Sequence, residues 1–228
     1  MAGIVKGIPM LNVYQIERHF RGGNFDPLLR GVAPIGLDLP LPLQVRLSSQ
    51  RAAVIALALR RVIEVTYGPT ALSRELTAAL LDRQNGDGSF GDGAKDGGLA
   101  VGDPLATAAA VAGLTALGRE HSNTPNPEAA LARERAIAAL AHFQVDSGLF
   151  ACGADRTDDD RALATAFILT LLAGDEDFRH AVRYADLMTW FDEHADQLDG
   201  GVGRLWQFAR IESPVVSMHE GAVAAIAA

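Results

Sequence analysis

The order of apolar and polar positions from Ser49 onward is typical of helices. Alanine, leucine and other strong helix formers dominate, and runs of β-branched residues are few. Asp103-Pro104 and Asn126-Pro127 each place a capping side chain before a proline, as at a helix start. No segment shows the alternation of a strand, so we predict an all-α fold with negligible sheet. The predicted helices span residues 49–67, 72–84, 103–117, 127–144, 160–173, 178–197, 204–211 and 215–226.

The predicted helices are of two kinds. Some carry charge on one face, as with Arg74 and Glu75 or the run Arg133-Glu134-Arg135. Others, such as the stretch from Ala106 to Leu117, are apolar nearly all round. A helix that is apolar all round is buried, whereas a helix with one charged face lies at the surface. We therefore expect a layer of buried helices inside a layer of exposed ones.

A sequence motif recurs after sixty residues. Gln84 is followed by Gly88 and Phe90, and Gln144 is followed in the same order by Gly148 and Phe150. The run Leu-Ala-Thr-Ala then appears at 105–108 and again at 163–166. A weaker third copy extends from Tyr184 through Gln197 to Trp206. Two motifs repeated in the same order indicate an internal repeat of helical hairpins, as in a helical solenoid that can close into a ring.

The first 48 residues differ from the rest of the chain. Gly22-Gly23 and prolines at positions 27, 34, 40 and 42 interrupt them, and leave room for one short helix over 13–20. We expect an irregular N-terminal arm over 1–48 and a repeat domain over 49–228.

The motif Leu-Leu-x-x-Gln-x-x-Asp-Gly-Ser-Phe-Gly, followed by Thr-Ala on the next helix, resembles the repeats of the terpenoid cyclase and protein prenyltransferase superfamily. Residues 81–91 carry this resemblance best, 144–150 less well and 197–206 weakly. It implies an α/α-toroid in which Gln84 with Phe90, and Gln144 with Phe150, brace the turns between outer and inner helices. A full ring of twelve helices usually needs a longer chain. The resemblance therefore implies either an incomplete toroid or one completed by self-association as a homo-oligomer.

The net charge and the composition limit the kinds of binding partner to be expected. The net charge is −8, the isoelectric point is near 5.2, and the 20 lysines and arginines are scattered. Nucleic acids and anionic membrane surfaces favour clustered basic residues, so neither is an expected partner. The most apolar stretch, 52–59, is too short to span a membrane. Cys152 is the only cysteine, so the chain cannot form an internal disulfide, as is usual for proteins of a reducing compartment. We therefore expect a soluble cytoplasmic protein.

Three consecutive acids, Asp158, Asp159 and Asp160, stand at the predicted start of a buried helix. Class II terpene cyclases carry Asp-x-Asp-Asp in a comparable place, and by this resemblance Asp159 would be the acid that protonates an alkene. The first position of that motif falls on Thr157 and the residue after it is Arg161, which departs from the family pattern. Acids also favour helix N-termini through capping and the helix dipole. The sequence leaves both interpretations open and favours capping.

Aromatic residues make up only 6% of the chain, which is few for a cavity that stabilises carbocations. Trp190, Phe191, Trp206 and Phe208 gather near the third repeat, where they either line a small ligand pocket, with Trp190, Trp206 and Phe208 as ligand-binding residues, or pack the core, which is favoured. Cys152 and Asp155 with His142 or His219 do not have the spacing of a zinc site, and Asn85 to Asp96 lacks the glycine of a calcium loop. We expect no metal and no cofactor.

Two functions follow from the sequence. The first is a repeat protein without a complete catalytic motif that binds an apolar small molecule, another ligand or a protein partner. The second is an enzyme that acts on isoprenoid or other apolar substrates. The incomplete acidic motif, the short chain and the low aromatic content favour the first.

Overall fold

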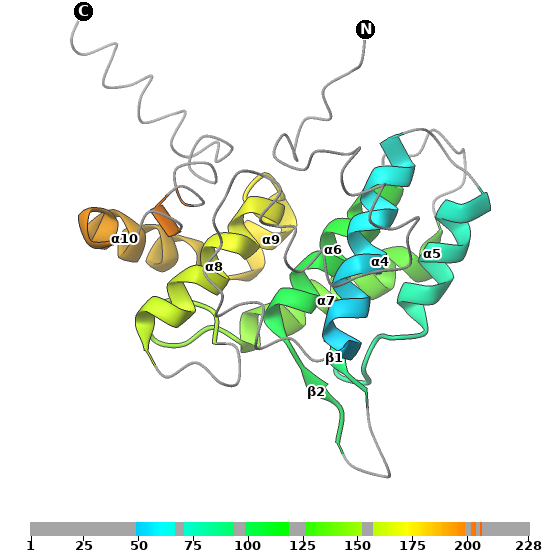
Figure 1. Ribbon diagram of the computed structural model, residues 1–228, viewed down its shortest axis with the longest axis horizontal. Helices are drawn as coiled ribbons and strands as arrows, with labels where there is room; N and C mark the ends of the chain where they lie inside the picture. The colour runs from blue at the N-terminus through cyan, green and yellow to red at the C-terminus, as the bar shows by residue number, and fades with distance from the viewer. Residues whose placement is uncertain are drawn as a thin grey trace, which may run out of the picture.

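The computed structural model describes residues 49–66, 71–93, 99–118, 126–151 and 157–198, with Val202, Gly203 and Trp206. Helix accounts for 72% of these residues, which confirms the all-α prediction in its coarse form. The elements are α4 (Ser49–Thr66), α5 (Ala71–Leu81), β1 (Gly91–Asp92), β2 (Val101–Gly102), α6 (Pro104–Gly118), α7 (Pro127–His142), α8 (Asp158–Leu172), α9 (Glu176–Ala181), α10 (Tyr184–His194) and the short 3-10 helix η2 (Ala195–Gln197) (Figure 1).

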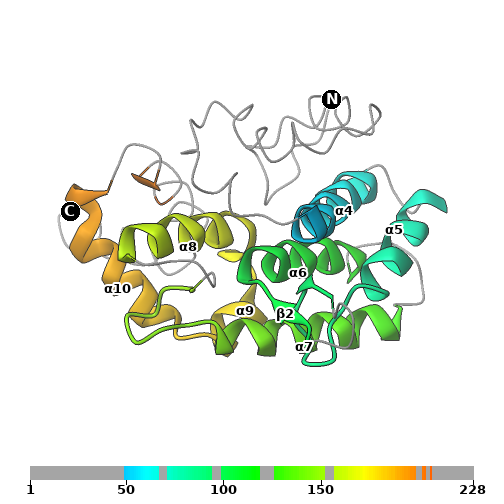
Figure 2. The ribbon, with the colours of Figure 1, turned by 60° about the horizontal axis from the view of Figure 1, so that its bottom comes forward.

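The helices form two layers. Helices α4, α6 and α8 make one layer, in which α6 packs against both α4 and α8 (Figure 2). Helices α5, α7 and α9 make the other, in which α7 contacts α5 and α9. Each helix of the first layer is followed in the chain by one of the second, so the chain runs through successive helical hairpins. Helices α5 and α10 lie at opposite ends of the molecule (Figures 1 and 2).

Helices α6 and α8 are the buried helices of this arrangement, as the sequence predicts. Every residue from Asp103 to Leu114 is buried, and so is every residue from Ala162 to Leu169. The contact between α4 and α6 is very close, because a Cβ atom on Gly113 would lie only 3.0 Å from the Cα atom of Ala58. Small side chains along α6 therefore allow the two helix backbones to approach each other.

The helix starts follow from their capping residues. The side chain of Asn126 accepts hydrogen bonds from the backbone N–H groups of Glu128 (3.0 Å) and Ala129 (3.3 Å), and Pro127 occupies the first turn of α7. Asp103 caps α6 in the same way, because its Oδ1 accepts from the N–H of Ala106 at 2.9 Å. These caps satisfy backbone donors that have no partner within the helix.

The two copies of the sequence motif form the same structure. In the first copy, Nε2 of Gln84 donates to the carbonyl of Gly88 at 2.9 Å; in the second, Gln144 donates to Gly148 at 2.7 Å. Both glycines have a positive φ, +89° and +82°, which other residues rarely adopt. The resulting turns carry Phe90 and Phe150 into the core, where both are fully buried.

The threonine of each Leu-Ala-Thr-Ala run completes this repeated unit. The backbone N–H of Phe90 donates to Oγ1 of Thr107 at 3.0 Å, and that of Phe150 donates to Oγ1 of Thr165 at 2.9 Å. Both threonines are fully buried on the following inner helix. We call this set of glutamine, positive-φ glycine, phenylalanine and threonine the hairpin module.

Three sequence-based expectations differ from the structure. The predicted helix over 178–197 is divided into α9, α10 and η2, because the chain leaves helical geometry at Val182, where φ is −104° and ψ is 164°. A short antiparallel pair, β1 with β2, joins Gly91 to Gly102 and Asp92 to Val101. Arg133, expected on the exposed face of its helix, is only 20% exposed and forms ion pairs.

Other expectations concern residues that the structure does not describe. The N-terminal arm over 1–48 and the predicted helix over 215–226 lie outside the described residues, and so does 204–211 apart from Trp206. Among the helices of the described part, none is both long and apolar enough to cross a membrane.

Candidate functional site

The predicted acidic cluster lies in the first turn of α8, where Asp158 is the first helical residue. The side chain of Asp158 is 55% exposed, and its Oδ1 lies 2.8 Å from the NH1 atom of Arg161 one turn along the helix. Asp159 and Asp160 follow it in α8, and their side chains lie outside the described part of the structure. For Asp158 the arrangement is that of a surface ion pair at a helix start, where the helix dipole favours negative charge.

The predicted aromatic group comes together around Phe191. Trp206 is 3% exposed and stacks on Phe191, with ring centroids 4.6 Å apart. Trp190 meets Phe191 edge to face at 5.2 Å and stacks on the ring of His194 at 4.3 Å. Phe208 lies outside the described residues. Sequence reasoning did not single out His194, although its spacing of four from Trp190 places both on one face of a helix.

An open pocket of about 650 Å³ lies beside the first hairpin module. Helix α4 contributes Gln50, Ala53 and Val54 to its lining. The turn after α5 contributes residues 82–86, and the β1–β2 region contributes Gly91, Gly93 and Ala100. This volume lies within the range of small-molecule sites in proteins, roughly 300–1,000 Å³.

The lining of this pocket combines side-chain amides with small apolar groups. Gln50 is held toward the β1–β2 region, because its Oε1 accepts from the backbone N–H of Gly93 at 3.1 Å. The amides of Gln84 and Asn85 belong to the first module, and Asn85 is buried and donates to Oγ of Ser89 at 3.2 Å. Such a surface offers hydrogen bonds to an uncharged polar group beside apolar contact area.

A cluster of charges lies next to the pocket residues Gln50, Gly91 and Gly93. Arg51 of α4 forms ion pairs with Asp92 (3.0 Å) and with Asp103 (3.2 Å). Burial raises the pKa of the Asp103 carboxyl, although the cap hydrogen bond from Ala106 and the charge of Arg51 act against this. The cluster fixes the N-terminal part of α4 against β1 and the start of α6, and so sets the shape of the pocket wall.

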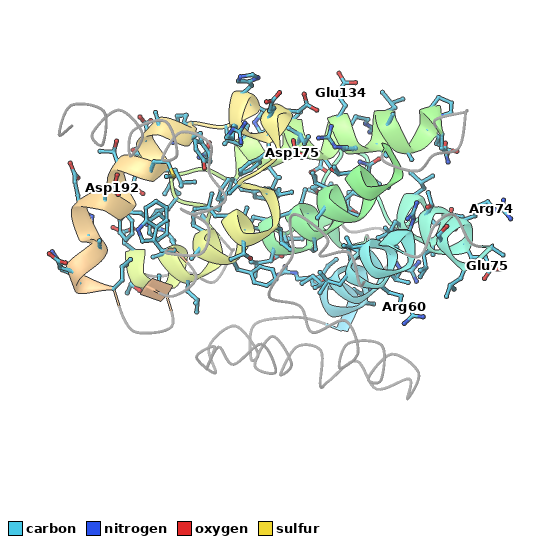
Figure 3. All side chains as sticks on the ribbon, turned by 90° about the horizontal axis from the view of Figure 1, so that it is seen from above. Arg60, Arg74, Glu75, Glu134, Asp175 and Asp192 are labelled. Atoms are coloured by element: carbon cyan, nitrogen blue, oxygen red, sulfur yellow. The ribbon has the colours of Figure 1, made fainter. Side chains whose placement is uncertain are left out.

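A second charged network joins α6, α7 and α9. Arg133 donates to Oγ1 of Thr115 (2.7 Å), to Asp175 (2.6 Å) and to Asp177 (2.7 Å). Hydrogen bonds and ion pairs with the two aspartates raise the pKa of Arg133, against the opposing effect of its burial. Asp175 also caps α9 through the N–H of Phe178. Glu134, the next residue along α7, projects away from the body (Figure 3).

No cluster of three or more histidine, cysteine, aspartate or glutamate side chains suited to a metal ion occurs among the described residues. Of the zinc set considered from the sequence, Cys152, Asp155 and His219 lie outside the described part.

Comparison with models of known protein families finds no match for this chain, and comparisons with curated proteins and with solved structures find none either. The site is therefore interpreted from its own geometry.

Proposed function

We propose that this protein is an α/α-toroid repeat protein, of the architecture seen in terpenoid cyclases and protein prenyltransferases, whose role is binding. It lacks a complete catalytic motif. Its ligand is a small, uncharged molecule that has both hydrogen-bonding groups and an apolar part, and that occupies the pocket beside the first module.

The repeated hairpin module supports the architectural part of this proposal. Gln84 and Gln144 make the same turn contact, and Thr107 and Thr165 accept the same backbone hydrogen bond. Two equivalent modules in consecutive hairpins are what a chain of identical repeats produces. The alternation of buried and exposed helices agrees with this.

The pocket of about 650 Å³ carries the binding part of the proposal. Its amide groups come from Gln50, Gln84 and Asn85, and its apolar contacts from Ala53, Val54 and Ala100. Asp82 and Arg83, one acid and one base, also line it, so the lining residues that the structure describes carry no net charge. A neutral ligand with a polar edge matches this lining better than an ion does.

Asp158 is the only member of the acidic cluster whose side chain lies within the described residues, and its setting differs from that of an acid that protonates an alkene. An acid that protonates an alkene holds its proton in a dry cavity. Asp158 is more than half exposed and paired with Arg161, so its side chain does not lie in such a cavity. Trp190 and Trp206 pack against neighbouring rings, and Trp206 is 3% exposed.

Ligand-observed NMR with a library of neutral amide and heterocycle fragments tests the pocket. Gly86 lies in the lining and Gly174 does not, and a Cβ atom at either glycine meets no atom within 4 Å. We expect fragment binding to the wild type and to Gly174→Trp, and loss of binding in Gly86→Trp. Equal binding to both variants, or no fragment bound at all, would show that the pocket is not a ligand site.

The enzymatic alternative is tested separately. Full-length protein is incubated with squalene or geranylgeranyl diphosphate, and the extract is examined by gas chromatography and mass spectrometry. We expect no cyclised product. A product formed by the wild type and absent from Asp159→Asn would replace the binding proposal with a cyclase.

A further inference from the structure

Each hairpin module makes a contact with the outer helix that follows it. Gln84 donates to the carbonyl of Ala132 in α7 at 2.7 Å, and a Cβ atom on Gly88 would meet the carbonyl of Arg135 at 2.7 Å. In the second module, Oε1 of Gln144 accepts from the N–H of Arg183 at 2.7 Å, and Gly148 lies against Leu187 of α10. The turn at the end of each hairpin thus contacts a later segment of the chain, α7 in the first case and the start of α10 in the second.

An arginine strengthens both contacts. Arg135 of α7 donates to the carbonyl of Gly86 in the first turn at 2.7 Å. Arg183, the residue before α10, donates to the carbonyls of Val145 and Asp146 in the second turn. In both contacts a glutamine of the turn bonds to the backbone of the segment that follows, and an arginine of that segment bonds to the turn; Gln84 donates in the first contact, whereas Gln144 accepts in the second.

Helix α5 is an outer helix on which one position of the corresponding face, Leu72, is exposed. With the sixty-residue offset of the motif, Leu80 matches Leu140, and both are fully buried. Glu75 matches Arg135, and both are exposed. Leu72, however, matches Ala132: Leu72 is 39% exposed whereas Ala132, which the first turn covers, is 4% exposed.

The other end of the molecule carries the complementary part. Gln197 ends η2 and occupies the place of Gln84 and Gln144 in the third copy of the motif. Its side chain is exposed, whereas those of Gln84 and Gln144 are partly buried at a neighbouring helix. Asp192 and Asp196, in α10 and η2, are exposed as well, while Arg74 and Glu75 lie on α5 at the other end (Figure 3).

We propose that α5 of one molecule receives the α10–η2 end of a second copy of this chain, through the interface that the chain uses twice internally. Gln197 of one copy then takes the role of Gln84, and Leu72 of the other takes the role of Ala132. Such a head-to-tail contact is heterologous, and joins unlike ends of identical chains. The inference rests on the repeat architecture and not on the ligand pocket. A negative result in the fragment-binding experiment would therefore not count against self-association, and a monomeric chain would not count against the pocket.

Sedimentation velocity of the full chain, from about 1 to about 100 µM, measures the association. We expect a reversible dimer or larger assembly that Leu72→Arg weakens on the order of tenfold or more. Leu131→Arg is the matched control, because Leu131 is an exposed leucine (56%) on α7, where the receiving face is already occupied. Gln197→Ala tests the opposite end and is expected to weaken association as well.

Circular dichroism of each variant confirms that it folds; both leucines are exposed, so each arginine can reach solvent. A chain that stays monomeric over the whole concentration range would overturn the proposal. Equal weakening by Leu131→Arg and Leu72→Arg would do the same, because it would show a general response to added charge.

Discussion

The side chain of Gln84 and the carbonyl of Ala132 are joined by a hydrogen bond of 2.7 Å across 48 residues of sequence. The same Nε2 atom holds the carbonyl of Gly88, so one amide group closes its own turn and fastens that turn to the next helix. This relationship makes the turn a structural joint between hairpins. The predictions below concern that joint and the charged groups around it.

Gly88→Ala is expected to destabilise the protein by about 1–3 kcal/mol, the usual cost of a non-glycine residue in such a conformation. Its φ is +89°, and the added Cβ would lie 2.7 Å from the carbonyl oxygen of Arg135. Urea denaturation followed by circular dichroism measures the change. Gly86→Ala is the control, because its Cβ meets no atom within 4 Å. Equal loss in both variants would show that the turn does not depend on Gly88.

Thr107→Val is expected to cost about 1–3 kcal/mol, the range for leaving a buried hydrogen-bonding group without its partner. Valine has nearly the shape of threonine but cannot accept the hydrogen bond from the buried N–H of Phe90. Thr165→Val should behave alike, because Thr165 serves Phe150 in the same way. Thr189→Val on the exposed surface of α10 is the control and should leave the free energy of unfolding nearly unchanged.

Arg133→Met is expected to destabilise the protein by about 1–3 kcal/mol, less than for a fully buried ion pair. Methionine preserves much of the apolar stem but leaves Asp175, which is 9% exposed, without its arginine. Arg161→Met removes the surface pair with Asp158 and should cost only about 0–1 kcal/mol. Thermal or urea denaturation of the two variants side by side gives the comparison. Equal losses would mean that Arg133 does not join the helices as described.

Asp103 is expected to make the protein less stable as pH rises from about 4 toward neutrality. Burial raises the pKa of Asp103 in the folded state above the ordinary value of 3.8, so the native state binds this proton more tightly than the unfolded state. Between the two pKa values, each rise in pH therefore lowers the free energy of unfolding. Asp103→Asn retains a capping oxygen but does not titrate. The stability of the wild type relative to Asp103→Asn should fall across this range.

Asp87 provides a control of opposite sign for that measurement. A hydrogen bond from the Ser89 hydroxyl lowers the pKa of Asp87 below 3.8. Its contribution is therefore complete above pH 3.8 and is lost as pH falls through the lower, folded pKa. The stability of the wild type relative to Asp87→Asn should rise with pH over the acidic range. If both asparagine variants shift in the same direction, the assignment of Asp103 is wrong.

The repeat and the helical class could be predicted because they depend on local signals. Each of these signals predicts the structure of the residues next to it: a glycine marks a turn, a proline after a capping residue marks a helix start, and an alanine-rich run marks a helix. The hydrogen bond from Phe90 to Thr107 could not be predicted, because it depends on how two helices meet. The division between α9 and α10 also escaped prediction: no proline or glycine stands at Val182–Arg183.

Charged residues show the same limit. Arg61 is fully buried in α4, where its Nε donates to Oγ1 of Thr77 at 2.9 Å, and nothing in the local sequence distinguishes it from the neighbouring Arg60. Likewise, the pocket draws its lining from α4, the turn after α5 and the β1–β2 region, which are far apart in the sequence. A single sequence gives no information on which of these segments meet.

The close contact between Ala58 of α4 and Gly113 of α6 limits the relative movement of the two helices and the side chains that position 113 can hold. At this point the two helix backbones leave too little space for even a methyl group to fit without a shift. A Cβ atom at position 113 would lie 3.0 Å from the Cα atom of Ala58, so α4 would have to shift by a few tenths of an ångström to admit an alanine there. Close packing resists relative movement, so we expect α4, which carries Gln50 and Arg51, to keep its place against α6 when a ligand binds. The wall of the pocket that α4 forms is thus preorganised, and a ligand must fit it as it stands.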